Sequence, residues 1–344
     1  MTPHRRRIEA GPTAGTAHCG EPASCACSPG EHPVVREVER RALGSDFGAD
    51  GYATRTEADE LARILGLGPG KRLLDVGAGQ GWPGLYLARE TGCTVIVTDV
   101  PFPGLAAASR RADREGIANR AWAIVAGGDR LPLRPACVDA VIHTDVLCCL
   151  RPKLATLRAT RGVLRPGGRT AFSVIFPTSG LPDAQARRAI EAGPPECELH
   201  TTYPNLLRSA GFVDVDEHDV TPDYLATARR KLEETERFAA GMVEALGPQE
   251  FEETQAKRRL AIRAIADGLL RRSVFVARRD PAATARRSRA AAMQGFGRRR
   301  LLRAGEGTGL EVGDGPLRAA AGSPHRRSAH RPCQQPGRVL QLVL

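Results

Sequence analysis

The stretch LLDVGAGQGWPG, residues 73–84, decides the fold of this chain. It holds two overlapping glycine patterns directly after an apolar run. Gly77, Gly79 and Gly81 form GxGxG, whereas Gly79, Gly81 and Gly84 form GxGxxG. The second pattern is typical of loops that bind dinucleotides. The two patterns imply different ligands, and the residues around them distinguish between the two.

The charges and the strand end argue against a dinucleotide. A pyrophosphate binds at a helix N-terminus, where free N–H groups and the helix dipole favour negative charge. Asp75 stands just before the loop, where its carboxylate would repel phosphates, and Pro83 removes one of the free N–H groups. The apolar run also ends at Val76, too early for GxGxxG. These residues favour GxGxG and a ligand with cationic groups, such as the ammonium and sulfonium of S-adenosylmethionine (SAM).

Outside this stretch, apolar runs alternate with amphipathic segments. We expect helices at the start of the domain and between most of the strands. The expected strands are residues 72–76, 94–100, 120–126, 138–146, 169–176, 212–220 and 272–279. Such alternation predicts an α/β fold with a doubly wound, mostly parallel sheet. Before the last strand, residues 222–270 indicate a helical insertion of two helices where a short connection would suffice.

Composition divides the chain into three parts. Residues 1–33 are rich in Pro, Gly, Ser and Cys without periodicity, and residues 281–344 are rich in Arg, Ala, Gly and Pro. We expect both segments to be disordered, because they have too few bulky apolar residues for a core. Residues 34–280 form the predicted domain. No run of 18 apolar residues exists, and the N-terminal charges precede no apolar signal segment, so we expect a cytoplasmic protein without a membrane span.

The net charge of +11 is concentrated in the tail. Residues 281–344 hold twelve Arg and three acidic residues, which leaves the rest of the chain close to neutral. A groove that tracks nucleic-acid phosphates is therefore not implied in the domain. The cysteines follow no disulfide-like spacing, as expected in a reducing compartment.

The leader contains several residue types that bind metals. Their spacing matches no familiar structural zinc site, and no apolar residues surround them. We therefore expect no metal site. The residues concerned are His18, Cys19, Cys25, Cys27 and His32.

The stretch LLDVGAGQG resembles the class I SAM-dependent methyltransferase family, and the resemblance covers about residues 51–279. It implies a Rossmann-like sheet of seven strands with the seventh antiparallel, and SAM as the cofactor. It also implies that Asp75 and the glycines Gly77, Gly79 and Gly81 bind the cofactor. Gln80 departs from the Cys or Ser of many members, but removes no group that SAM needs.

The resemblance extends to later strands. An acid at the end of the second strand, here Asp99, would bind the two ribose hydroxyls. An acid after the third strand, here Asp129 between Gly128 and Arg130, would lie near the adenine amino group. In the fourth strand, His143 stands where family members line the methyl-donor pocket.

Each of these residues also has a purely structural interpretation. Asp75 could cap the next turn, and Asp99 could be a turn residue at the strand end, since Pro101 follows. Asp is common in glycine-rich turns such as the one around Asp129. His143 could be a core histidine with its hydrogen bonds satisfied. The spacing from the glycines favours the binding interpretation for the first two.

The resemblance implies transfer of the SAM methyl group to an acceptor by direct displacement, which mainly requires alignment and exclusion of water. His143, Asp145 and His200 are the weak candidates for a base, if the acceptor must lose a proton. Tyr52, His200 and Tyr203 could face the acceptor. We expect a small molecule, because the helical insertion could enclose an apolar pocket over the strand ends. The alternatives are a nucleic-acid methyltransferase that uses the basic tail, a nicotinamide-dependent oxidoreductase, and an inactive SAM-binding protein.

Overall fold

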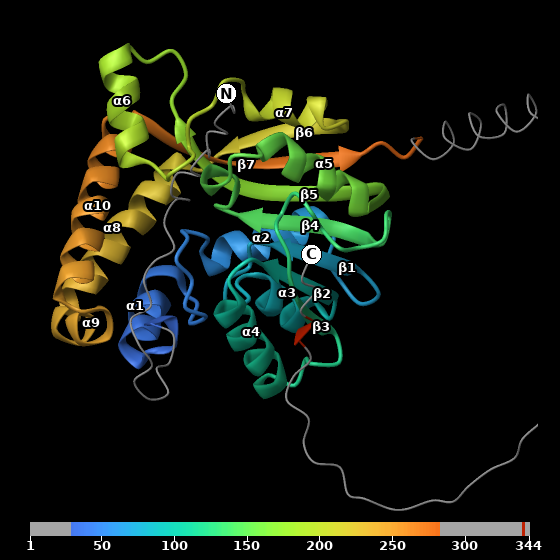
Figure 1. The fold of residues 1–344 in the computed structure, drawn as a ribbon, viewed down its shortest axis with the longest axis horizontal. Helices are drawn as coiled ribbons and strands as arrows, with labels where there is room; N and C mark the ends of the chain where they lie inside the picture. The colour runs from blue at the N-terminus through green and yellow to red at the C-terminus, as the bar shows by residue number, and fades with distance from the viewer. Residues whose placement is uncertain (1–28, 283–338, 341–344) are drawn as a thin grey trace, which may run out of the picture.

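A single sheet organises the protein, whose computed structural model describes residues 29–282 and 339–340. Its strands run in the order β6-β7-β5-β4-β1-β2-β3-β8 (Figure 1). The strands are β1 (Arg72–Val76), β2 (Thr94–Asp99), β3 (Ala121–Val125), β4 (Val138–Thr144), β5 (Leu164–Pro177), β6 (Phe212–Asp219), β7 (Leu270–Arg279) and β8 (Val339–Leu340). All neighbours are parallel except the two pairs that β7 forms with β5 and β6. The predicted mostly parallel α/β sheet is confirmed, and its seventh strand is antiparallel.

Helices connect the strands and cover the sheet. They are α1 (Pro33–Leu43), α2 (Arg55–Leu65), α3 (Gly84–Thr91), α4 (Phe102–Arg114), α5 (Lys153–Val163), α6 (Asp183–Ala192), α7 (Tyr203–Ser209), α8 (Thr221–Arg237), α9 (Ala239–Leu246) and α10 (Pro248–Ala266), with short 3-10 turns at Pro29–Glu31 (η1) and Leu147–Cys149 (η2). None of the helices in the described ranges is long and apolar enough to cross a membrane.

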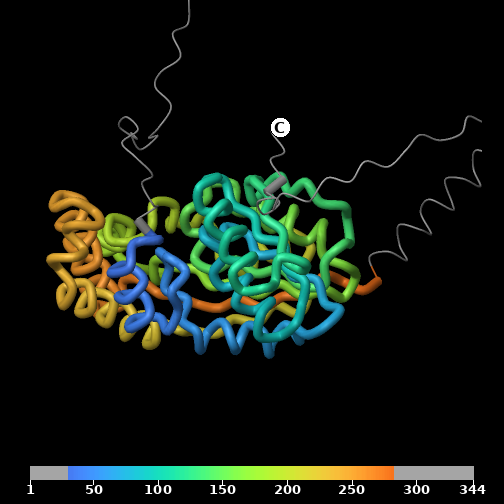
Figure 2. The backbone as a smooth tube through the Cα atoms, turned by 90° about the horizontal axis from the view of Figure 1, so that it is seen from below, coloured from blue at the N-terminus to red at the C-terminus, as the bar shows by residue number. Residues whose placement is uncertain are grey.

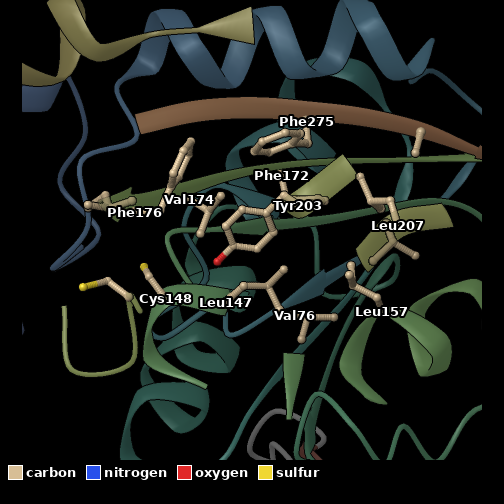
Figure 3. Packing of buried hydrophobic residues seen from close by; sticks show 14 of the residues in the cluster. Val76, Leu147, Cys148, Leu157, Phe172, Val174, Phe176, Tyr203, Leu207 and Phe275 are labelled. Atoms are coloured by element: carbon tan, nitrogen blue, oxygen red, sulfur yellow. The ribbon is translucent and has the colours of Figure 1, made fainter. Parts of the chain in front are cut away.

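The sheet has a separate apolar cluster on each face, because successive strand residues point to opposite faces. In β1, Leu73 belongs to one cluster, whereas Leu74 and Val76 belong to the other. The second of these clusters includes the stacked rings of Phe172 and Phe275, which are 5.4 Å apart between centroids (Figure 3). Both faces of the central strands are therefore buried, which fixes the positions of the strand ends.

Helices α1, α8, α9 and α10 gather at one end of the molecule, as Figures 1 and 2 both show. This end is the one at which the parallel strands finish. The amide of Tyr52, in the α1–α2 loop, donates to Asp145, which directly follows β4. Lys231 of α8 in turn donates to the carbonyls of Asp50 and Gly51. The helices thus lie over the edge of the sheet where open α/β folds bind ligands.

The helical insertion differs from the two helices expected at 222–270, because the structure has three. Phe238 leaves the helical conformation, with φ −105° and ψ 25°, and separates α8 from α9. Gly247, with φ 83°, separates α9 from α10. The Phe238 ring lies below the guanidinium of Arg41, 5.3 Å from the ring centroid. The apolar spacing continues across Phe238, so helical periodicity predicts one helix over residues 222–246.

The predicted leader and tail lie mostly outside the described residues, as do the possible metal ligands His18, Cys19, Cys25 and Cys27. His32 is described and caps α1, with its side chain accepting from the Val34 amide. Within the predicted tail, Val339–Leu340 are described and pair with β3. Without β8, strand β3 would present unpaired backbone groups at the sheet edge. The apolar run VLQLVL that contains β8 went unrecognised as a strand.

Candidate functional site

The loop between β1 and α3 requires its glycines. Gly77, Gly79 and Gly81 have φ values of 72°, 54° and 100°, a backbone region that favours glycine. A Cβ atom on Gly77 would lie 2.5 Å from Cγ2 of Val146, beyond the end of β4. A Cβ on Gly79 would meet nothing within 4 Å. The loop therefore packs against the chain after β4 at one glycine and leaves open space beside another.

Asp75 lies beneath this loop and is 1% exposed. Its Oδ2 accepts from the Gly84 amide at 2.9 Å, so the carboxylate occupies the N-terminus of α3. Its Oδ1 is buried and has no hydrogen-bond partner among the described residues. Burial raises the pKa of the Asp75 carboxyl well above its usual range, which the Gly84 amide only partly offsets. A cationic group on this oxygen would relieve the cost of burying the charge.

Asp99 ends β2 beside the same loop. Its Oδ2 accepts from the Gly79 amide at 2.7 Å, and its Oδ1 accepts from the Val100 amide at 2.7 Å. Each carboxylate oxygen retains further acceptor capacity for a ligand hydroxyl. Val100 and Phe102, which follow, are 64% and 46% exposed despite being large and apolar. The sequence gives no sign that these two apolar side chains are exposed, because exposure depends on the folded structure.

The residues predicted around the adenine lie in the turn after β3. Gly128 is closely packed, since a Cβ would lie 3.2 Å from Cγ1 of Val76 and 3.1 Å from Cγ2 of Thr156. The Asp129 side chain is 30% exposed, and its Oδ2 lies 3.6 Å from Nε of Arg130, whose own side chain is 82% exposed. Gly128 thus touches the end of β1, whereas Arg130 points into solvent. Their roles toward a cofactor remain predictions.

His143, in β4, is completely buried and stacks on Phe172 with 4.3 Å between ring centroids. Neither ring nitrogen has a hydrogen-bond partner among the described residues, so His143 is not a satisfied core histidine. Burial lowers its pKa to about 3. The ring is therefore neutral and weakly basic at physiological pH, which argues against a role as general base. A place in the donor pocket stays a prediction.

Asp145 is held in an ion pair that the sequence did not reveal. Its Oδ1 accepts from Nε of Arg272 at 2.8 Å, and its Oδ2 accepts from the Tyr52 amide at 3.1 Å. Arg272, 1% exposed, also donates to both carboxylate oxygens of Glu57 and to the Ser173 hydroxyl. Burial would lower the pKa of Arg272, but Asp145 and Glu57 more than reverse this effect and raise it. Asp145 is thus an anchored structural anion rather than a free base.

His200 and Tyr203, the other acceptor-side candidates, occupy a different place from the glycine loop. His200 is exposed and lines a cavity of about 410 Å³ at the end of β5, together with Phe176 and Glu217. No glycine-loop residue lines this cavity. Tyr203 is 1% exposed, and its hydroxyl, which has no partner among the described residues, is directed toward Cys148 (Figure 3).

Two further cations lie on the helices over the site. Lys231 of α8 is 5% exposed, and Arg258 of α10 is partly buried. Tyr52 packs its ring edge against Tyr224 of α8, with 4.7 Å between centroids, and lies 5.2 Å from the Lys231 ammonium. Lys231 lies on the same buried face of α8 as Tyr224 and Ala228. This position on an apolar helix face is the sequence signal that could have identified Lys231 as a buried residue.

The chain is similar to known methyltransferases. A family model described as a methyltransferase domain matches residues 74–172. Methyltransferase GfsG of Streptomyces halstedii is 30% identical over 171 residues, 47% of this chain and 60% of that protein. A phosphoethanolamine N-methyltransferase of Triticum aestivum is 26% identical over 216 residues, 62% of this chain and 41% of that protein. The chain therefore spans about half the length of these two relatives.

Solved structures share the fold. Phosphoethanolamine N-methyltransferase 2 of Haemonchus contortus, in complex with phosphomonomethylethanolamine and S-adenosylhomocysteine, gives a TM-score of 0.62 at 18% identity, over 71% of this chain and 56% of that one. The [4+2]-cyclase SpnF gives 0.56 at 22% identity, over 72% and 92%. At these identities the likeness shows the fold alone. The family match, however, spans the glycine loop, Asp99 and Asp129, so residues 74–172 are similar to the methyltransferase domain of class I SAM-dependent enzymes.

Proposed function

We propose that this chain transfers the methyl group of SAM to a small-molecule acceptor. The observation that carries the proposal is the environment of Asp75. Its carboxylate fills the N-terminus of α3, the place where a dinucleotide would put its pyrophosphate. It also leaves one buried oxygen without a partner, which suits a cationic donor. These two facts favour SAM over a nicotinamide dinucleotide.

The other residues of the loop fit the rest of the donor. Asp99 would accept hydrogen bonds from the ribose hydroxyls, because its carboxylate is already oriented by the amides of Gly79 and Val100. Gly79, with open space beside it, allows close approach of the ligand to the backbone. Asp129 would lie near the adenine amino group. Each assignment follows the family pattern, and the contacts of Asp99 and the open space beside Gly79 support the first two.

SAM would supply an electrophilic methyl group on a positively charged sulfur. The chain's own residues would hold donor and acceptor in line and exclude water, the requirement of a direct displacement. His143 is neutral, and Asp145 is paired with Arg272. These contacts support a mechanism in which neither residue accepts a proton, so an acceptor that is already nucleophilic fits best.

The relatives support a small acceptor. Their names specify phosphoethanolamine in Triticum aestivum and 27-O-demethylrifamycin SV in Amycolatopsis mediterranei. The near-neutral domain argues against a nucleic acid, because binding to phosphates depends on clustered Lys and Arg. A SAM-binding protein that transfers no methyl group is the second candidate, since one fold neighbour is named a cyclase.

Calorimetry on the full chain tests the donor. We expect binding of SAM and S-adenosylhomocysteine but not of NAD. Asp99→Ala should lower the affinity for SAM by about tenfold or more, as expected for the loss of charge-assisted hydrogen bonds. Asp113→Ala, which removes an exposed acid from α4, serves as the control and should leave affinity unchanged. NAD binding, or unchanged SAM affinity in a folded Asp99→Ala variant, would overturn the assignment. Binding without turnover of any acceptor would favour the second candidate.

A further inference from the structure

Two positively charged side chains project from neighbouring helices of the insertion into the same region. The Lys231 ammonium donates to the carbonyls of Asp50 and Gly51, each at 3.0 Å. The Arg258 guanidinium donates through Nη1 to the Thr235 hydroxyl at 2.9 Å and to Oε1 of Gln255 at 3.1 Å. Thr235 is one helical turn beyond Lys231, so Arg258 reaches across to the helix that carries the lysine.

All of these partners are neutral. No carboxylate oxygen of the described residues lies within 4.0 Å of either Lys231 or Arg258, although most buried cations in proteins are paired. Both hydrogen bonds that Arg258 donates to described residues come from Nη1. The Tyr52 ring lies 5.2 Å from the Lys231 ammonium, so Tyr52 and the two positively charged side chains share one region.

The two cations are close enough to repel. Burial lowers the pKa of Lys231 to about 8, and Arg258 is the next largest cause. Burial also lowers the pKa of Arg258. The negative groups that act on this region are Asp50, Glu39 and Asp145.

None of those three acids neutralises the pair directly. Asp50 is exposed, and no described cation lies within ion-pair distance of it. The Glu39 carboxylate is occupied by the amides of Phe47, Gly48 and Ala49. The Asp145 carboxylate is already paired with the Arg272 guanidinium. The cost of placing Lys231 beside Arg258 is therefore not offset within the described chain, and a bound anion would offset it.

Lys231 and Arg258 are also linked by a chain of contacts to the β1–α3 glycine loop, here called the donor loop because it is proposed to bind SAM. Lys231 fixes the Asp50–Gly51 turn, and the next residue, Tyr52, donates its amide to Asp145. Val146 then packs against Gly77 of the donor loop. A ligand that bridges this distance would place one end at the cations and the other end near the donor.

We propose that Lys231, Arg258 and the Tyr52 hydroxyl bind a phosphate group on the methyl acceptor, at the end remote from the methylated atom. Two cations match the two negative charges of a phosphate monoester, and a lysine and an arginine are both common phosphate ligands. The inference rests on the proposed methyl transfer, since it assigns the acceptor class of that same site.

The first test is calorimetric titration of the full chain with inorganic phosphate, with and without S-adenosylhomocysteine. Lys231→Met and Arg258→Gln should each weaken phosphate binding by about tenfold or more, because each removes a charge-assisted contact. Lys231→Arg, which keeps the charge, should retain most of the affinity. Lys257→Met, an exposed neighbour on α10, is the matched control and should bind as the parent chain does. S-adenosylhomocysteine affinity should be the same in every variant.

Methylation assays provide the second test, with phosphoethanolamine and ethanolamine as probe acceptors that differ by the phosphate. We expect competition by inorganic phosphate against turnover of the first probe, and little turnover of the second. The inference would be overturned if no binding were detected with inorganic phosphate at concentrations up to about 10 mM, where even weak complexes form. Equal binding by folded Lys231→Met and Arg258→Gln, or tighter binding of acetate than phosphate, would overturn it as well. Failure of S-adenosylhomocysteine to bind would instead overturn the proposed function.

Discussion

Arg272→Met is expected to destabilise the domain strongly. The arginine is 1% exposed in β7, and it donates five hydrogen bonds to Glu57, Asp145 and Ser173, with atom separations of 2.6–3.2 Å. The methionine would fill much of the volume but leave the two carboxylates, 14% and 7% exposed, without their cation. Breaking a buried ion pair on one side costs about 3–5 kcal/mol. We expect about 3 kcal/mol, because Glu57 retains some contact with water and the Tyr52 amide still bonds to Asp145.

The measurement is urea unfolding of the parent chain and its variants, followed by circular dichroism. Arg271→Met is the matched control. Its guanidinium pairs with Asp219 at the surface, where side chains are 38% and 47% exposed, and such pairs contribute about 0–1 kcal/mol. Adding Glu57→Gln to Arg272→Met should recover stability, because one unpaired charge is removed. The reasoning is refuted if Arg272→Met and Arg271→Met lose the same free energy of unfolding, or if Glu57→Gln makes the double variant worse.

Three further changes probe the donor half. Asp75→Asn should lower the affinity for SAM more than the affinity for S-adenosylhomocysteine in calorimetry, because only SAM carries the sulfonium charge. Equal losses of affinity would contradict this. His143→Leu should reduce acid sensitivity. The histidine pKa is about 3 when folded and 6.5 in the unfolded reference, so the unfolded chain binds more protons between these values and stability falls as pH drops through 6.5. Between pH 7 and pH 5.5 the parent should lose about 1 kcal/mol more than His143→Leu in urea titrations, and parallel curves would exclude it. Gly77→Ala should abolish detectable SAM binding in a folded protein, because its Cβ would meet Val146 at 2.5 Å, and retained affinity would show that the loop can shift.

The strand positions and the glycine loop follow from local sequence. Alternation of apolar runs and amphipathic segments located the seven main strands, because burial on both faces leaves a continuous apolar run that is visible without the fold. Asp75 and Asp99 could be identified because each stands at a strand end, and parallel strand ends meet at one edge. The geometry adds that Asp75 caps α3, so its structural and binding interpretations are compatible.

The acceptor side could not be read in the same way. Arg272 stands within an apolar strand, and its partners Glu57 and Asp145 are separated from it by 215 and 127 residues. A periodic pattern carries no information about such pairings. Arg258 likewise looks like an ordinary helix charge until its contact with Thr235 of α8 is known. Lys231 shares a helix face with Tyr224 and Ala228, but its partners Asp50 and Gly51 are about 180 residues away in sequence. His143 was placed in the right strand, but only its packing on Phe172 shows that it is dehydrated and without hydrogen bonds.

The helices over the site have an apolar cluster of their own. Val38, Met242 and Phe251 pack together apart from the two clusters that flank the sheet. Substitutions in this cluster can change how helices α1 and α8–α10 lie over the strand ends, while the strands that carry Asp75 and Asp99 keep their positions. Under the proposed methyl transfer, a lineage could thus change the acceptor and still inherit the donor-binding half intact. For an engineer, α1 with α8–α10 is the unit to randomise when a new acceptor is sought, and the sheet is the part to leave alone.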